Sequence, residues 1–120
     1  MKITTNLDEI NKILNTYNHE KARIWLFDIT HVRLAIKIYS NKNDDVIYLI
    51  MIKCEYIRGP FSFNNPELYV NQIFNDTTSN TKFKVIDKKA GFEMISMGGI
   101  TLAAGQDPEF GSSFENFLNE

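Results

Sequence analysis

The feature that most constrains the fold of this chain is a change in the spacing of its apolar residues near Ala22. Before that point they recur at intervals of three and four residues, which predicts one amphipathic helix over residues 6–17. Its apolar face consists of Leu7, Ile10, Ile13, Leu14 and Tyr17. Asn6 is suited to cap this helix, because its side chain can accept a hydrogen bond from a free N–H of the first turn. After it, apolar residues recur at every second position, the spacing of β-strands.

Three segments, 22–29, 31–39 and 46–57, are predicted to form an antiparallel meander. The first is apolar on both faces, with Ile24 and Leu26 on one face and Trp25, Phe27 and Ile29 on the other. We expect it to be a central strand, because a strand that is apolar on both faces must be covered on both faces. The third segment is the longest and is broken by Gly59-Pro60.

The second half of the chain predicts further strands. Residues 67–74 fit a helix or a strand, and their β-branched and aromatic content favours a strand. Residues 82–87 and 92–97 flank Lys88-Lys89-Ala90-Gly91, which suits a hairpin loop. A last strand follows at 100–104, and Ser112-Ser113 can cap a short terminal helix carrying Phe114, Phe117 and Leu118. We therefore predict an α+β fold in which an N-terminal helix packs on a mainly antiparallel sheet of six or seven strands, closed as a small barrel or a sandwich.

Composition narrows the class of protein. With 120 residues the chain is expected to form a single domain, 1–120. The chain has 13 Lys and Arg and 15 Asp and Glu, which gives a net charge of -2. This charge argues against binding nucleic acid through bulk charge. The longest apolar run, 46–52, is far shorter than the ~20 residues of a membrane helix. The N-terminus has no apolar stretch of the signal-peptide kind, so we expect a cytoplasmic protein that does not enter a membrane.

Few residues have the chemistry of a catalytic or metal site. His31 with Asp28 or Cys54 could form an acid–base or nucleophilic pair. The simpler interpretation is that Asp28 and Thr30 shape a turn, and that Cys54 is a small buried apolar residue of a strand. Two histidines and one cysteine fall short of the usual zinc ligand sets, and no phosphate-binding glycine motif is present. We therefore predict no catalytic, metal or cofactor residues, and no enzyme.

The only basic cluster comprises Lys82, Lys84, Lys88 and Lys89. Lysines beside aromatic residues could contact RNA or another polyanion. A charged hairpin that stays soluble is the simpler interpretation, and the net negative charge favours it.

Aromatic residues are the most informative group. Most of them must be core, but the stretch from Tyr56 to Phe63 follows a strand and contains a rigid Gly-Pro break. Aromatic and Arg side chains anchor protein interfaces. The residues that we predict to contact a partner or ligand are Trp25, Tyr56, Arg58, Phe61 and Phe63.

Residues 25–34, WLFDITHVRL, and residues 54–61, CEYIRGPF, resemble segments of short, stand-alone, uncharacterised bacterial proteins. Some small bacterial proteins of this kind are similar to immunity proteins, which bind and inhibit a toxic partner. The resemblance implies no catalytic residues. The expected function is that of a non-catalytic domain that binds another protein, or a second copy of itself. The alternative is a small-ligand-binding domain with a pocket lined by Trp25, Tyr48 and Tyr56.

Overall fold

The structure is a computed structural model that describes residues 2–16, 19–30, 32–42, 44–74 and 81–106. Its elements, in chain order, are β1 Lys2–Thr4, α1 Leu7–Thr16, β2 Lys21–Asp28, β3 Arg33–Tyr39, β4 Asp45–Ile52, β5 Cys54–Arg58, β6 Ser62–Asn64, β7 Tyr69–Phe74, β8 Thr81–Asp87, β9 Phe92–Ser96 and β10 Ile100–Gln106. Within these residues no helix is both long and apolar enough to cross a membrane.

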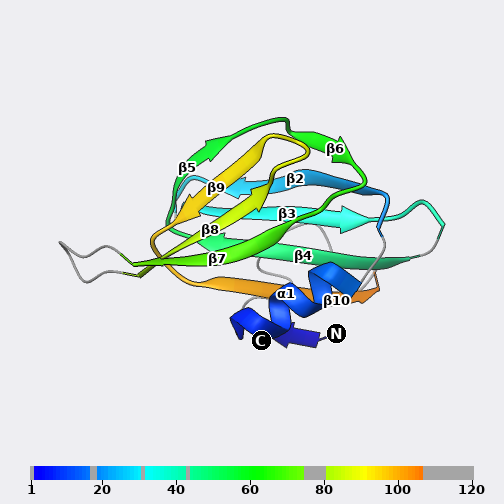
Figure 1. Ribbon diagram of the computed structural model, residues 1–120, viewed down its shortest axis with the longest axis horizontal. Coiled ribbons are helices and arrows are strands. Elements are labelled where there is room, and N and C mark those ends of the chain that lie inside the picture. Colours follow the sequence, from blue (N-terminus) through cyan, green and yellow to red (C-terminus); the bar gives the residue numbers. More distant parts are fainter. Residues whose placement is uncertain (1, 17–18, 31, 43, 75–80, 107–120) are drawn as a thin grey trace.

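The strands form two antiparallel sheets. The first has six strands in the order β1-β10-β4-β3-β2-β6, and the second has four in the order β5-β9-β8-β7. In Figure 1 the four-stranded sheet lies in front of the six-stranded sheet, and α1 lies beside β7 and β10. The two layers form a sandwich with a helix along one side.

The main core lies between the two sheets. On β4 the side chains alternate strictly, so that Ile47, Leu49 and Met51 point toward the second sheet. They meet Val85 and Met94 of that sheet, and all of these side chains are fully or almost fully buried. Because burial of a large aliphatic side chain contributes roughly 1.5–3 kcal/mol, contacts between the two sheets dominate the stability of the fold.

The helix closes one edge of the sandwich. Asn6 Oδ1 accepts a hydrogen bond from Glu9 N at 2.9 Å, which confirms the predicted cap. Ile10 and Ile13 are buried in the main core. Asn11 reaches the edge strand β7, where its Nδ2 donates to Val70 O and its Oδ1 accepts from Val70 N, both at 2.8 Å. The amide thereby satisfies backbone groups that an edge strand would otherwise leave open.

A sheet-switching point separates β4 from β5. Lys53 has a φ of 57°, in the left-handed region, and turns the chain from the six-stranded sheet into the four-stranded one. Met97 N donates to Lys53 O at 3.0 Å and Cys54 N donates to Val32 O at 3.1 Å, so both neighbouring turns hold the switch in place. The segment 46–57, predicted as one strand, is thus two strands in different sheets.

Other predictions are confirmed or corrected as follows. The meander β2-β3-β4, the hairpin β8-β9 and the strand assignment of residues 69–74 are confirmed. The predicted α+β fold with mainly antiparallel strands agrees with the structure, and of the two closures considered the described residues form the sandwich and not the barrel. The count of six or seven strands in one sheet is wrong, since the described residues form ten strands in two sheets. The central strand is β4 and not β2, which has only the short β6 beyond it. The strand β1 was missed because three residues carry no periodic signal, and the predicted helix at 112–118 lies outside the described residues.

The Asn11 amide supplies a first test of this architecture. The Asn11→Ala substitution leaves the N–H and C=O of Val70 without their partner. We therefore expect the free energy of unfolding, measured by urea denaturation, to fall by about 1–3 kcal/mol. Asn15→Ala is the matched control, because it makes the same exchange at an exposed position of α1. It should change stability by no more than about 0.5 kcal/mol, and equal effects of the two variants would contradict the assignment.

Candidate functional site

The segment 54–64, which we call the crossing segment, runs from β5 in one sheet to β6 in the other. Ile24 N donates to Phe61 O at 2.8 Å, so the segment follows the edge of β2 after leaving the four-stranded sheet. Gly59 has a φ of +127°, and a Cβ there would lie 2.8 Å from Gly91 O. This close approach fixes the segment against the β8-β9 hairpin, so that its side chains are displayed from a rigid backbone.

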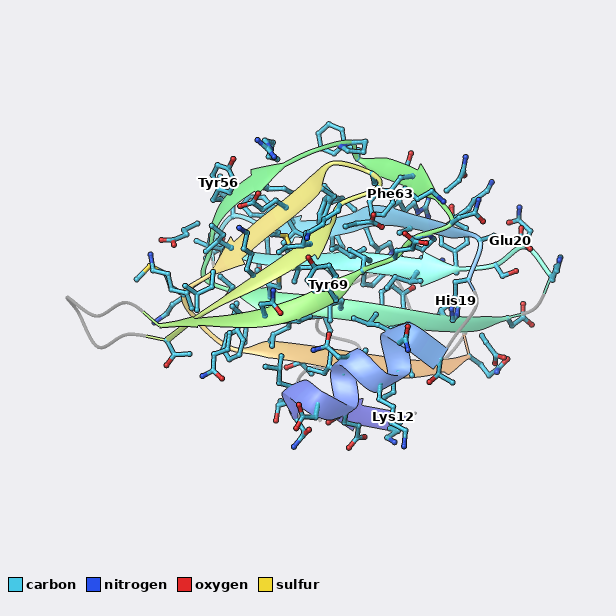
Figure 2. The ribbon with its side chains drawn as sticks, in the orientation of Figure 1. Lys12, His19, Glu20, Tyr56, Phe63 and Tyr69 are labelled. Carbon is cyan, nitrogen blue, oxygen red and sulfur yellow. The ribbon has the colours of Figure 1, made fainter. Side chains whose placement is uncertain are left out.

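Three of the predicted contact residues are exposed on the crossing segment. Tyr56 is 43% exposed and Phe61 is 79% exposed. Arg58 lies on the outer face of the four-stranded sheet opposite Glu93, at an N–O distance of 3.8 Å. Figure 2 shows Tyr56 at the start of the segment, toward the outside of the molecule. The structure therefore presents these three side chains to solvent on one strip.

Phe63 and Trp25 do not belong to that strip. Phe63 is half-buried, with its ring centroid 5.4 Å from that of Phe92 in the main core. Trp25 lies at a register shift between β2 and β3 and packs on Tyr48, with 4.3 Å between ring centroids. The register shift also brings Leu26 to the same side as Trp25, whereas simple alternation predicted opposite faces.

A second exposed group adjoins the start of the crossing segment, at the end of the sandwich. We call it the apolar end. The turn after β2, the switch at Lys53 and the turn after β9 meet there through backbone hydrogen bonds. Its large side chains are between 38% and 80% exposed, and they are Phe27, Ile29, Val32, Ile52 and Met97. In Figure 1 these turns gather at the end where the arrows of β2 and β4 point.

Backbone strain is concentrated at the apolar end. Val32 has a φ of 51°, a conformation that costs a β-branched residue of order 1–3 kcal/mol. Lys53 also has a positive φ and lies next to Cys54, whose N–H bonds to Val32 O. Strained residues cluster where function requires a particular geometry. The strain and the exposed apolar side chains thus coincide at one end of the molecule.

Two of the four lysines of the basic cluster are paired with carboxylates. Lys82 Nζ lies 2.7 Å from Glu55, and Lys84 Nζ lies 3.0 Å from Glu93, on the outer face of the four-stranded sheet. Ion pairs of this half-exposed kind contribute little to stability, but they lower the positive charge that these two lysines present to a polyanion.

The described residues that were considered for acid–base or thiol chemistry have contacts that serve the fold. Asp28 accepts hydrogen bonds from Thr30 N at 3.0 Å and from the Arg33 guanidinium at 2.6 Å, which confirms its predicted role in the turn. Burial raises the pKa of the half-buried Cys54 thiol above its ordinary value, and the nearby Glu55 carboxylate adds to this. A raised pKa makes a poor nucleophile at neutral pH. His31, the base considered for either pair, lies outside the described residues.

Two cavities flank α1. One, of about 630 Å³, lies between the helix and the β1, β4 and β10 strands, and the other, of about 760 Å³, lies between the helix and residues 66–69. Both are lined in part by polar side chains of α1, and Trp25, Tyr48 and Tyr56 line neither of them. In the described part of the chain no group of His, Cys, Asp and Glu could hold a metal ion.

Comparison of the chain with protein-family models, with curated proteins and with solved structures finds no match. The interpretation of the site therefore depends on its own geometry.

Sequence analysis missed the apolar end. A signal was present, since Phe27 and Ile29 flank Asp28 at a turn, where exposed apolar residues are unusual. Ile52 and Met97 carried no such signal. They are exposed because the chain changes sheet between β4 and β5, and alternation along a single strand does not reveal that change.

The apolar end depends on a close approach at Gly98, which a pair of glycine variants can test. A Cβ at Gly98 would lie 2.6 Å from Ile52 O, whereas a Cβ at Gly99 would meet no atom within 4 Å. We expect Gly98→Ala to lower the free energy of unfolding by about 1–3 kcal/mol, because the backbone must move. Gly99→Ala should leave it within about 0.5 kcal/mol. Equal unfolding curves for the two variants would show that the approach is not tight.

The state of the Cys54 thiol can be measured by alkylation. Because burial raises its pKa, we expect the rate of reaction with iodoacetamide to rise at higher pH in the native protein than in urea. The folded state holds this proton more tightly than the unfolded state, so stability should fall as pH rises above the ordinary thiol pKa. Cys54→Ser should abolish that part of the pH dependence. An alkylation profile at the ordinary pKa would contradict the effect of burial, and a profile below it would indicate an activated nucleophile.

Proposed function

We propose that this protein is a non-catalytic domain that binds another protein through the apolar end and the crossing segment. The exposed strip formed by Tyr56, Arg58 and Phe61 has the aromatic and Arg composition that is typical of interface hot spots. Arg58 supplies a polar rim beside apolar anchors, the usual arrangement of a protein interface.

The observation that carries this proposal is the uneven distribution of exposed apolar side chains. Among the described residues every large exposed apolar side chain except Ile3 belongs to the apolar end or the crossing segment. Exposed apolar side chains that gather in a few neighbouring segments mark interaction sites in soluble proteins. An aromatic-lined ligand pocket has less support, because Trp25, Tyr48 and Tyr56 line neither of the two cavities beside α1.

From the similarity to immunity proteins we propose a more specific role, in which the partner is a toxic protein that this chain inhibits by binding it. A rigid strip that contributes side chains rather than catalytic groups fits an inhibitor, since inhibition requires only that the partner's active surface be covered. A second copy of this chain is the other partner that such a surface could accept, and an oligomeric-state measurement distinguishes the two.

The experiment begins with capture of the tagged full-length chain from its source cells and identification of stoichiometric partners by mass spectrometry. Affinity is then measured by calorimetry for the native chain and for a variant carrying Tyr56→Ala and Phe61→Ala. Because both side chains are exposed, the fold should be retained while affinity falls by about tenfold or more.

Ile3→Ala is the matched control, because Ile3 is 47% exposed but lies on β1, away from the proposed surface. Its affinity should equal that of the native chain. Sedimentation of the purified chain tests self-association by the same surface. A monomer with no stoichiometric partner, or a partner whose affinity is unchanged by the double substitution, would overturn the proposal.

A further inference from the structure

The strand β5 forms an open edge of the four-stranded sheet. Within the described residues it pairs with β9 alone, and residues 55–58 are all exposed to solvent. In Figure 1 it lies at the upper border of that sheet, with no further strand of the sheet beyond it. An edge of this kind presents unpaired N–H and C=O groups, to which another strand can bind.

The other edges that the structure describes are covered or short. On β7 the Asn11 amide occupies both backbone groups of Val70, and β1 and β6 have only three residues each. β5 has five residues and contains neither Lys nor Pro, two residues that commonly protect an edge. Its one irregularity, the register shift between Cys54 and Tyr56, lies at its start. Among these edges β5 is therefore the best suited to accept another strand.

The direction of its backbone groups shows where a new ladder would form. Cys54 N donates to Val32 O at 3.1 Å, so this N–H points away from β9. Backbone groups alternate between the two sides of a strand, and the extra residue at the register shift moves this alternation by one position. Ile57 and Gly59 therefore direct their N–H and C=O groups to the open edge.

The Ile57 side chain lacks a neighbour on this edge. It lies opposite Met94 in the register with β9, and opposite residues of paired strands share a face, so Ile57 points to the core side of the sheet. Met94, which has a strand on each side, is 0% exposed, whereas Ile57 is 42% exposed. A strand added beyond β5 would supply the missing neighbour and extend the core.

The side chains of β5 are complementary to a second β5 in antiparallel orientation. A pairing centred on Ile57 puts this residue of each copy opposite its equivalent, on the core side. On the outer face it puts Tyr56 of each copy opposite Arg58 of the other, since both lie one residue from the centre. The Arg58 side chain is 67% exposed, and a guanidinium group binds favourably to a Tyr ring. No like charges stand opposite one another in this register, because Glu55 lies opposite Gly59.

We propose that two copies of this chain associate through β5, in an antiparallel pairing centred on Ile57 that joins their four-stranded sheets into one continuous sheet. The ladder spans residues 55–59, because Val32 occupies the edge at Cys54 and the chain leaves the sheet at Pro60. This inference rests on the proposed function, since it concerns the same surface. The dimer is the resting state that covers Tyr56 and Arg58, and another protein binds there once the two copies separate.

Sedimentation velocity of the purified full-length chain, over a wide range of concentrations, tests the association. We expect a dimer for the native chain and a monomer for Ile57→Lys, which places two ammonium groups opposite one another at the centre of the pairing. Ile3→Lys is the matched control, because Ile3 is 47% exposed on β1, an edge strand of the other sheet. It should remain a dimer.

A native chain that is monomeric at every concentration, or a dimer that Ile57→Lys leaves intact, would overturn the pairing. Neither result touches the proposed function, which is decided by affinity for a captured partner and not by the state of the free chain.

Disulfide formation tests the geometry and does not require Ile57→Lys to fold. In a chain carrying Cys54→Ser, Ile57→Cys puts two thiols at opposite positions of neighbouring strands, where Cα atoms lie about 5.5 Å apart, within the range of a disulfide. We expect a covalent dimer under mild oxidation. Met97→Cys in the same background is the control, because Met97 is 45% exposed but lies at the apolar end. Cross-linking at position 57 that is no faster than at position 97 would overturn the proposal.

A mixture of two variants tests the register. In the Cys54→Ser background, Tyr56→Cys chains and Arg58→Cys chains should cross-link to one another much faster than either cross-links to itself, because only the mixed pair stands directly opposite. Faster cross-linking of either variant to itself would contradict a pairing centred on Ile57.

Discussion

Burial of both faces of β4 is the constraint on which the rest of the structure depends. Six consecutive residues, Val46 to Met51, are apolar and almost fully inaccessible to solvent. Because neighbouring side chains of a strand point to opposite faces, such a run needs a cover on each side. The four-stranded sheet and α1 cover one face. The second face carries the smaller cluster around Tyr48, against which Trp25, Leu26 and Tyr39 pack.

The change of sheet at Lys53 follows from the same constraint. A strand that continued straight from β4 would extend the first sheet and leave its inner face open. By turning at a left-handed residue, the chain starts the second sheet and supplies the layer that covers β4. The turn has a cost, since Val32 and Lys53 are strained and Ile52 is left exposed. The strained, apolar end of the sandwich is therefore a direct result of how its core is closed.

The crossing segment connects this packing to the proposed binding surface. It joins the two sheets along one edge, and a rigid backbone approach at Gly59 fixes it. Side chains on such a segment lose little conformational freedom when they bind, because the backbone that carries them is already ordered. On the outer face of the four-stranded sheet, where Arg58 lies, lysines and glutamates pair with one another. These ion pairs form a polar margin beside the proposed binding surface.

The sequence by itself determined the local structure of this protein: the capped helix, the meander, the hairpin and the strands, whose apolar spacing depends only on near neighbours. It also indicated that the stretch containing Tyr56, Arg58 and Phe61 would be exposed to solvent, because Gly59 and Pro60 interrupt a strand beside aromatic residues. Only the tertiary structure decided that residues 46–57 divide between two sheets, that Phe63 turns into the core, and that Trp25 lies on the outer face. Each of these depends on partners far away in the chain, such as Met94 opposite Ile57 or Phe92 against Phe63, and the spacing of residues along one strand contains no information about which distant strand will cover it.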